Sequence, residues 1–396
     1  MRKIVFFMAM LSLSIFTCTR CTDDNNQTLV FEKKQAVQEE PQTPTVTPGD
    51  NTSETPGETP GGSTGETPGG STETTPAQPG SDLVIVAYVT YWDKVIPDPS
   101  LVTHINYAFA HVKSTFDGVE VKTPSRLQQI VKLKEQNPKL KILLSVGGWE
   151  AGNFSEMAAS ASYRKSFCED CLAVCKKYNL DGIDMDWEYP TSSSAGISSS
   201  PNDTKNFTLL MKDLRETLGN DYLITMASSA SAKYVDFKSC IQYMNFVNLM
   251  TYDMGRPPKH HSALYPSSGK TSRSVKESVA LHKTAGVPYE KIVVGAPFYC
   301  KAATSSTSGD GTYYGKMGSL FSKYTEKWDD TCKVPYLADS DGNMVFTYDN
   351  PKSIGLKADY VIANKLCGMM FWNWEGDNTT TWEMTHAIYD KFYPAQ

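Results

Sequence analysis

The sequence predicts an α/β fold, a closed (β/α)8 TIM barrel with a small insertion between strands 7 and 8. Eight short apolar runs rich in β-branched residues recur between residue 81 and the C-terminus. Most of them are followed by a longer stretch with the pattern of an amphipathic helix. Strands that are apolar almost throughout are typical of parallel sheets, which helices cover on both faces. An open doubly wound sheet is the alternative, but no glycine-rich phosphate loop follows the first run.

Residues 1–80 precede this domain and differ from it in composition. Residues 1–21 join a basic start to an apolar run too short to span a membrane, which is typical of an export signal. Cys18 and Cys21 close this run and are the two candidate lipid-anchor sites. The acidic segment after Cys21 resembles the surface-export signals of Bacteroidota lipoproteins. We therefore expect an exported protein, lipid-anchored at the outer membrane; cleavage to a soluble secreted form is the alternative.

We predict that residues 22–80 form a disordered tether. From about residue 41 this segment consists largely of Thr, Pro, Gly, Ser and Glu, and the octapeptide GETPGGST occurs twice in succession. Such a composition cannot bury enough apolar surface to offset the entropy of ordering the chain. The predicted organisation is an anchor, a tether and one folded domain at residues 81–396.

Composition excludes some partners and cofactors. The net charge of −6 and the pI near 5.6 give no basic footprint for nucleic acid. Cys168, Cys171 and Cys175 recur at helical spacing, which predicts one buried helix face; a zinc site would need a fourth ligand that the neighbourhood lacks. Cys300 and Cys332 could pair in an exported protein. We expect no metal and no cofactor, and a domain that acts as a monomer.

The eight predicted strands place polar and aromatic residues at one mouth. They are Leu83–Tyr88, Ile105–Phe109, Lys141–Val146, Gly182–Trp187, Leu223–Ser228, Phe246–Tyr252, Ile292–Pro297 and Gly368–Trp372. Six of them end in aromatic or acidic clusters, a pattern that core packing alone does not require. In a TIM barrel the C-terminal ends of all strands meet at the same face. The segment between the last two strands, about Lys301 to Tyr348, is long enough to form a cap or wall at this mouth.

The fourth predicted strand carries the chemistry. The stretch 181–190 holds four carboxylates in eight residues. Strand alternation puts Asp184, Asp186 and Glu188 on one face and turns Asp181 away, so we interpret Asp181 as structural. Asp184 and Asp186 are expected to share a proton, and Glu188 is the candidate general acid. An acidic edge strand and a cation-binding loop are the alternatives, although this stiff motif offers few of the oxygen ligands that Mg²⁺ or Ca²⁺ requires.

The stretch DGIDMDWEYP at 181–190 resembles the D-x-x-D-x-D-x-E signature of glycoside hydrolase family 18, in the form typical of chitinases. The motifs SVGGW at 145–149 and MTYD at 250–253, and residues 368–372, are similar to other motifs of that family and occur in the same order. The resemblance runs from residue 81 to the C-terminus. It implies hydrolysis of β-1,4 bonds between N-acetylglucosamine units in chitin or chito-oligosaccharides, by a retaining mechanism in which the substrate's acetamide is the nucleophile.

The resemblance also implies a role for each motif residue. Glu188 would protonate the leaving oxygen, Asp186 would orient the acetamide, Asp184 would balance the proton of Asp186, and Tyr252 would donate to the acetamide carbonyl. The implied substrate-binding and supporting residues are Tyr88, Phe109, Ser145, Gly148, Trp149, Tyr189, Met250, Asp253 and Trp372. Among them, Trp149 would be a platform on the leaving-group side and Trp372 the floor beneath the sugar. The family often has a tryptophan shortly after the Tyr-Asp pair, and residues 254–261 of this chain contain none.

Two other functions stay open. An endo-β-N-acetylglucosaminidase acting on N-glycan cores would use the same chemistry on another glycan. A non-catalytic glycan-binding lipoprotein would keep the barrel and lose the acid, whereas Glu188 is present here. The expected partners are chitin or another N-acetylglucosamine-containing glycan and, through the lipid anchor, a membrane.

Overall fold

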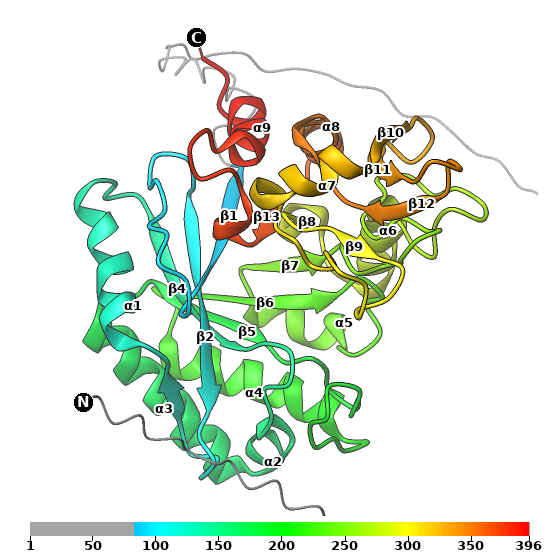
Figure 1. The fold of residues 1–396 in the computed structure, drawn as a ribbon. Coiled ribbons are helices and arrows are strands. Elements are labelled where there is room, and N and C mark those ends of the chain that lie inside the picture. The colour runs from blue at the N-terminus through cyan, green and yellow to red at the C-terminus, as the bar shows by residue number, and fades with distance from the viewer. Residues whose placement is uncertain (1–82, 396) are drawn as a thin grey trace, which may run out of the picture. The chain divides into compact units, whose positions relative to one another are not determined.

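The computed structural model describes residues 83–395 (Figure 1). The predicted export signal, the candidate anchor sites Cys18 and Cys21, and the predicted tether lie outside the described residues. Within the described part of the chain, no helix is long and apolar enough to cross a membrane.

Eight parallel strands form a closed barrel, which confirms the predicted fold and excludes the open sheet. They are β1 (Val84–Thr90), β2 (His104–Val112), β4 (Lys141–Gly147), β5 (Gly182–Asp186), β6 (Leu223–Ser229), β7 (Phe246–Met250), β8 (Ile292–Pro297) and β13 (Gly368–Trp372). The barrel closes because β1 pairs with β13 on one side and with β2 on the other. The short strand β3 (Val119–Val121) pairs in antiparallel orientation with the C-terminal end of β2.

Alternation along the strands separates two apolar cores. On β1, Ile85 and Val89 face outward into the large core between barrel and helices, while Val86 and Tyr88 face into the barrel. The same alternation on β5 sends its apolar residues outward and its carboxylates inward. The barrel interior is thus the place where buried polar groups must find partners.

Helices cover the outside of the barrel (Figure 1). They are α1 (Pro124–Val131), α2 (Phe154–Ala159), α3 (Ala161–Tyr178), α4 (Asp203–Leu218), α5 (Phe237–Cys240), α6 (Val275–Ala285), α8 (Pro351–Ala363) and α9 (Glu383–Phe392). Short 3-10 turns, η1 (Lys132–Glu135), η2 (Ile241–Tyr243), η3 (Tyr289–Lys291), η4 (Tyr314–Lys316) and η5 (Trp374–Gly376), complete the connections. The predicted buried cysteine face is confirmed on α3, where Cys168, Cys171 and Cys175 are all buried.

The insertion predicted between the last two barrel strands is confirmed as a small antiparallel sheet. Its strands β9 (Lys301–Ala302), β10 (Thr325–Asp329), β11 (Val334–Ala338) and β12 (Met344–Thr347) pair in the order β10-β11-β12-β9, beside helix α7 (Gly318–Lys323). The insertion has a core of its own around Leu337 and Phe346.

The suggested pairing of Cys300 with Cys332 is not formed, since both are free and buried. Cys300 belongs to the core of the insertion, where its thiol contacts the carbonyl of Gly309 at 3.3 Å. Cys332 packs in a separate cluster with Ala263 and Val334. The two thiols are therefore buried in different apolar environments.

Candidate active site

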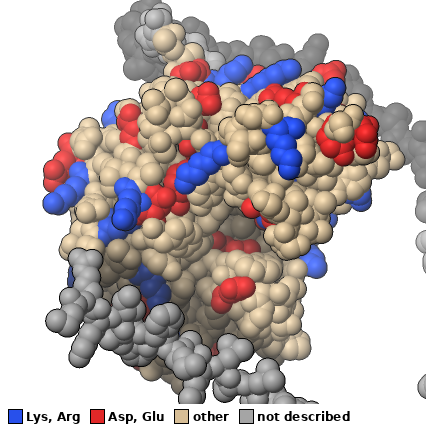
Figure 2. Space-filling model, viewed as in Figure 1, with Lys and Arg blue, Asp and Glu red and all other residues tan. Residues whose placement is uncertain are grey.

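A cleft of about 680 Å³ opens at the C-terminal ends of the barrel strands. In the ring of strands, β1 and β2 lie opposite β6 and β7. Because Trp92 follows β1 while Ser231 and Met254 follow β6 and β7, the cleft runs across the whole mouth. The space-filling view shows a hollow in this face of the molecule with acidic side chains beside it (Figure 2).

Most of the residues expected from the sequence line this cleft. They are Tyr88, Phe109, Trp149, Asp186, Glu188, Tyr189, Met250, Tyr252, Asp253 and Trp372. Asp184, Ser145 and Gly148 do not line it. These three residues lie behind or beneath the lining residues. They therefore support the lining side chains and do not face the space that a ligand would fill.

Asp184 lies inside the barrel and is fully buried. Its Oδ2 accepts hydrogen bonds from the hydroxyls of Tyr88 at 2.9 Å and Ser145 at 2.8 Å. Its Oδ1 accepts from Thr225 Oγ1 at 2.5 Å and Asn248 Nδ2 at 3.2 Å. Burial raises the pKa of Asp184, and these four donors offset only part of that effect. The four donors come from four different strands and fix the position of this carboxyl group.

Asp186, one alternation further along β5, is buried but poorly partnered. The residue is 3% exposed, and its Oδ1 has no hydrogen-bond partner among the described residues. Burial, together with the charges of Glu188 and Asp184, holds the pKa of Asp186 well above its usual range. A buried polar atom without a partner is costly, so this oxygen is suited to accept a hydrogen bond from a ligand in the cleft.

Glu188 lies just past the end of β5, because the strand ends at Asp186 and not at Trp187 as predicted. Burial raises the pKa of Glu188 to about 7, where the Asp253 charge adds to the effect and a hydrogen bond with Tyr189 opposes it. The neighbouring Tyr189 ring is held by stacking on Tyr234, with 4.6 Å between ring centroids. A carboxyl group with a pKa near neutrality can both give and take a proton at physiological pH.

Aromatic rings form the floor and the open edges of the cleft. Trp372 stacks on Phe109 with 5.5 Å between centroids and also packs against Tyr88. Trp149 and Trp92 are 55% and 52% exposed, far more than core aromatics. Exposed tryptophans at the edges of the cleft, together with the partly buried Trp372 at its floor, suit the faces of sugar rings.

Gly148 supports this floor by being small. Its φ is +96°, and a Cβ there would lie 2.6 Å from the Phe109 ring. Its backbone N–H donates to the Asp186 carbonyl at 2.9 Å. The glycine is therefore required by the packing of Phe109 and not by direct access to the cleft.

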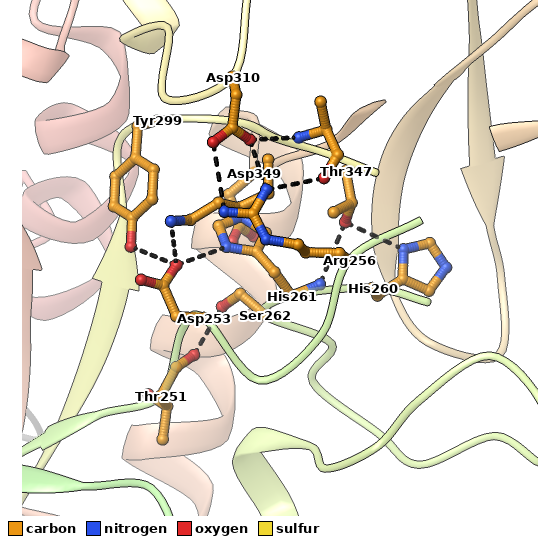
Figure 3. Close-up of polar contacts among 12 residues, drawn as sticks. Thr251, Asp253, Arg256, His260, His261, Ser262, Tyr299, Asp310, Thr347 and Asp349 are labelled. Atoms are coloured by element: carbon orange, nitrogen blue, oxygen red, sulfur yellow. Dashed lines mark hydrogen bonds and ion pairs between the residues drawn. The ribbon is translucent and has the colours of Figure 1, made fainter. Parts of the chain in front are cut away.

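Asp253 follows β7, which ends at Met250 and so leaves Tyr252 and Asp253 on the loop. The carboxylate of Asp253 accepts from the Tyr299 hydroxyl at 2.8 Å and pairs with Lys301 Nζ at 3.2 Å (Figure 3). His261 Nδ1 lies 3.6 Å away. Partial desolvation in the cleft would raise the pKa of Asp253, although its side chain is 51% exposed, but these neighbours outweigh it and hold the pKa at about 2. Asp253 is therefore a fixed anion at neutral pH.

Asp181 turns away from this cluster, as strand alternation predicted. Its carboxylate pairs with Lys134 Nζ at 2.5 Å and accepts from the Ile142 N–H at 2.8 Å. These contacts link the start of β5 to β4 and to Lys134, at the end of the barrel opposite the cleft.

One group of residues has the donor types for a metal. Among the described residues, His260, Asp329 and Cys332 bring their ligand atoms within 4.8 Å of one another. However, Asp329 Oδ2 already accepts from Lys270 Nζ at 2.8 Å and faces His260 Nε2 at 3.2 Å, while its Oδ1 accepts backbone N–H groups. The carboxylate is satisfied by these donors, and the Lys270 ammonium supplies the positive charge that a metal would bring.

Sequence reasoning did not assign several residues of the site. Thr225 and Asn248 lie in the middle of apolar strands, and their inward direction follows only from the closed barrel. Other lining residues that were given no role are Tyr91, Trp92, His111, Gly147, Ala227, Ser229, Ala230, Ser231, Met254, Ser272, Arg273 and Tyr299. The position of Tyr91, Trp92 and Tyr299 at strand ends was a usable signal for those three.

A TIM barrel whose C-terminal cleft combines buried carboxyl groups on one strand with exposed tryptophans is the architecture of a glycoside hydrolase. Residues 84–377 match the model of the glycosyl hydrolases family 18, and the chain belongs to this family. This confirms the resemblance seen in the sequence.

Individual relatives agree with this assignment. The chain is 32% identical over 377 residues to chitinase A1 of Niallia circulans, covering 72% of this chain and 54% of that protein, or about half of its length. A family 18 N-acetylglucosaminidase from Paenibacillus barengoltzii is 36% identical, with a TM-score of 0.70, over 78% of this chain and 99% of that one. The cell-surface chitinase ChiW of a Paenibacillus species is 32% identical, with a TM-score of 0.73, over 79% of this chain and 43% of that one.

Proposed function

We propose that this domain hydrolyses β-1,4 bonds between N-acetylglucosamine units of chitin or chito-oligosaccharides, with retention and with the substrate's acetamide as nucleophile. The observation that carries the proposal is the pair Asp186 and Glu188. A buried carboxyl oxygen without a partner lies on the same strand end as an acid whose pKa is about 7. This pair provides one acceptor for an N–H group and one proton donor, which is what the substrate-assisted route needs.

In the first step Glu188 donates its proton to the glycosidic oxygen as the bond from that oxygen to C1 breaks. The acetamide oxygen forms a new bond to C1 and gives an oxazolinium ion. Asp186 accepts a hydrogen bond from the acetamide N–H through its Oδ1, and the positive charge that develops on the oxazolinium ion favours the ionised form of this carboxyl group. In the second step the Glu188 carboxylate takes a proton from water, the water oxygen attacks C1, and the acetamide is released with the original configuration restored.

Two further groups support this chemistry. Burial and nearby carboxyl groups raise the pKa of Tyr252 well above its usual value, so its hydroxyl stays protonated and able to donate to the acetamide carbonyl. The hydroxyl's contact with Met370 Sδ, at 3.9 Å, is weak and leaves it available. Asp184, held by its four donors, fixes the electrostatic environment of Asp186 from below.

The third carboxylate of the cleft does not replace the acetamide as nucleophile in this proposal. The ammonium of Lys301 and the hydroxyl of Tyr299 engage Asp253, and its pKa of about 2 makes it a weak nucleophile. We assign Asp253 to sugar binding.

The second candidate function is release of single N-acetylglucosamine units. The similarity to the Paenibacillus barengoltzii N-acetylglucosaminidase favours it. It uses the same groups and differs only in how many sugars the cleft holds on the non-reducing side. Cleavage at an N-glycan core stays a prediction, which a product profile on a high-mannose glycoprotein tests.

We also propose that the protein is exported and anchored by a lipid on Cys18 or Cys21. The basic start, short apolar run and acidic segment of residues 1–26 support this proposal. Metabolic labelling with a palmitate analogue, compared between the wild type and the Cys18→Ala and Cys21→Ala variants, identifies the acceptor. Absence of label in the wild type would overturn the anchor.

The experiment that tests the activity is a product profile on chito-oligosaccharides of increasing length beside a high-mannose glycoprotein. Disaccharide or longer products support the chitinase proposal, monosaccharide alone supports the second candidate, and glycan release from the glycoprotein alone overturns both. Glu188→Gln should abolish turnover and leave oligosaccharide binding nearly unchanged, because the amide fills the same space but cannot protonate the leaving group.

A further inference from the structure

The loop that carries Asp253 is tied to the insertion by several polar contacts (Figure 3). Arg256 forms a two-pronged ion pair with Asp310, at 2.7 and 3.2 Å. Further along the loop, the His261 N–H donates to Thr347 Oγ1 at 3.2 Å. The loop after β7 and the insertion after β8 are therefore linked by an ion pair and a hydrogen bond.

The Arg256–Asp310 pair also holds a piece of backbone. Arg256 Nη1 donates to the Ala302 carbonyl at 2.9 Å, and the Ala302 N–H donates to Asp310 Oδ1 at 2.7 Å. Both polar groups of this one residue are thus bound by the two members of the ion pair. Asp310 is mostly buried, with a side chain that is 10% exposed, so the pair is less screened by water than a surface ion pair.

The residue next to Ala302 is Lys301, whose ammonium lies 3.2 Å from the Asp253 carboxylate. A lysine side chain has four rotatable bonds, so a fixed backbone is the condition for holding its charge at one place. The chain of contacts runs from Asp310 through the backbone of Ala302 to Lys301, and from there to the cleft.

We propose that Arg256 and Asp310 are positioning residues that clamp the first strand of the insertion, keep Lys301 on Asp253 and so set the charge beside the catalytic acid. The proposal rests on the proposed function in one respect, the role of Glu188 as the acid. It assigns to the insertion a part in tuning the reaction, although none of residues 301–348 lines the cleft, so the expected cap or wall at the mouth is not seen.

Asp253 faces several titratable or charged groups. They are Lys301, His261, Tyr299, Tyr252, Glu188 and Arg256. Burial lowers the pKa of His261, so this imidazole is neutral at the pH of interest. Lys301 is the lysine that pairs with Asp253, at 3.2 Å. If the Lys301 side chain moves away from Asp253, less of the negative charge of Asp253 is neutralised. The pKa of Glu188 then rises, because a nearby negative charge disfavours its ionised form.

The variant that opens the clamp is Asp310→Ala. Its matched control is Asp330→Ala, which removes an exposed partner of Lys333 from the same insertion. We expect Asp310→Ala to lower kcat on chito-oligosaccharides roughly tenfold with KM within about twofold. The basic limb of its kcat/KM profile should move to higher pH by several tenths of a unit. The control should match the wild type in both.

Arg256→Lys provides a second variant that keeps the charge and is expected to fold. A lysine cannot bind both Asp310 and the Ala302 carbonyl as the guanidinium does. It should therefore show the same upward shift at smaller size. A lower unfolding temperature with an unmoved basic limb in both variants would show a structural pair only and overturn the proposal.

A carbon-13 NMR titration of the Glu188 carboxyl group separates this proposal from the proposed function. The resonance is assigned by its loss in Glu188→Gln. If the wild type cleaves no chito-oligosaccharide, the proposed function fails while the titration still decides about the clamp. A higher Glu188 pKa in Arg256→Lys or Asp310→Ala supports the clamp, and an unchanged pKa overturns it.

Discussion

Glu188→Gln should stabilise the folded domain at alkaline pH, although it removes the catalytic acid. The pKa of Glu188 is raised from 4.5 to about 7, chiefly by burial. The unfolded chain ionises this group near pH 4.5, whereas the folded domain keeps it protonated to about pH 7. Stability is therefore lost as pH rises between these two values, and the full cost is present above the folded-state pKa.

The size of the effect follows from the shift. A difference of about 2.5 pKa units at about 1.4 kcal/mol per unit gives roughly 3.5 kcal/mol, the most that Glu188→Gln can recover at pH 8. The protonated acid and the amide are both neutral at pH 4, so the two proteins should be equally stable there. Coupling with Asp186 reduces the gain, because part of the cost passes to the other carboxyl group.

The assay is urea unfolding of wild type and variant at pH 4 and pH 8, followed by tryptophan fluorescence. Glu135→Gln, at an exposed carboxyl group on η1, is the control for loss of a surface charge and should change stability by less than about 0.5 kcal/mol at both pH values. Equal stability of wild type and Glu188→Gln at pH 8 would refute the reasoning that burial of the ionised Glu188 carboxylate destabilises the folded domain.

Three other predictions concern activity on chito-oligosaccharides. The kcat/KM profile should fall above about pH 7, because Glu188 must be protonated to act; a flat profile to pH 9 would contradict its role. Trp149→Ala should raise KM roughly tenfold with little change in kcat, since a ring that is 55% exposed offers its face to the sugar. Tyr163→Ala, an exposed aromatic on α3, is its control. Thr225→Val should lower kcat roughly tenfold, because it removes the 2.5 Å donor to Asp184 while keeping the shape of the side chain.

Much of the fold was predictable because the barrel strands are short, mostly apolar runs separated by helix-like segments. All eight predicted runs correspond to barrel strands, with ends that differ by a few residues. The exact ends were not predictable: Trp187 continues the alternation of β5 but packs into the outer core beyond the last strand hydrogen bond. The insertion was visible as excess length between two strands, while its sheet order depends on contacts that no local pattern encodes.

The site residues likewise divide into those that the sequence predicts and those that only the folded barrel brings together. Alternation on β5 alone separated the inward Asp184 and Asp186 from the outward Asp181. By contrast, the donors to Asp184 come from β1, β4, β6 and β7, which meet only when the barrel closes. Lys301 and His261 reach Asp253 through the insertion and a loop, so only the structure brings them together.

The stereochemistry of the first product tests the central claim most directly. Chitotetraose is added to the enzyme in deuterated buffer, and the anomeric protons are recorded by NMR within the first seconds to minutes, before mutarotation. Attack by the substrate's acetamide followed by water gives net retention, so the account predicts that the new reducing end forms as the β-anomer. An initial excess of the α-anomer would contradict the acetamide mechanism and the roles assigned to Asp186 and Glu188.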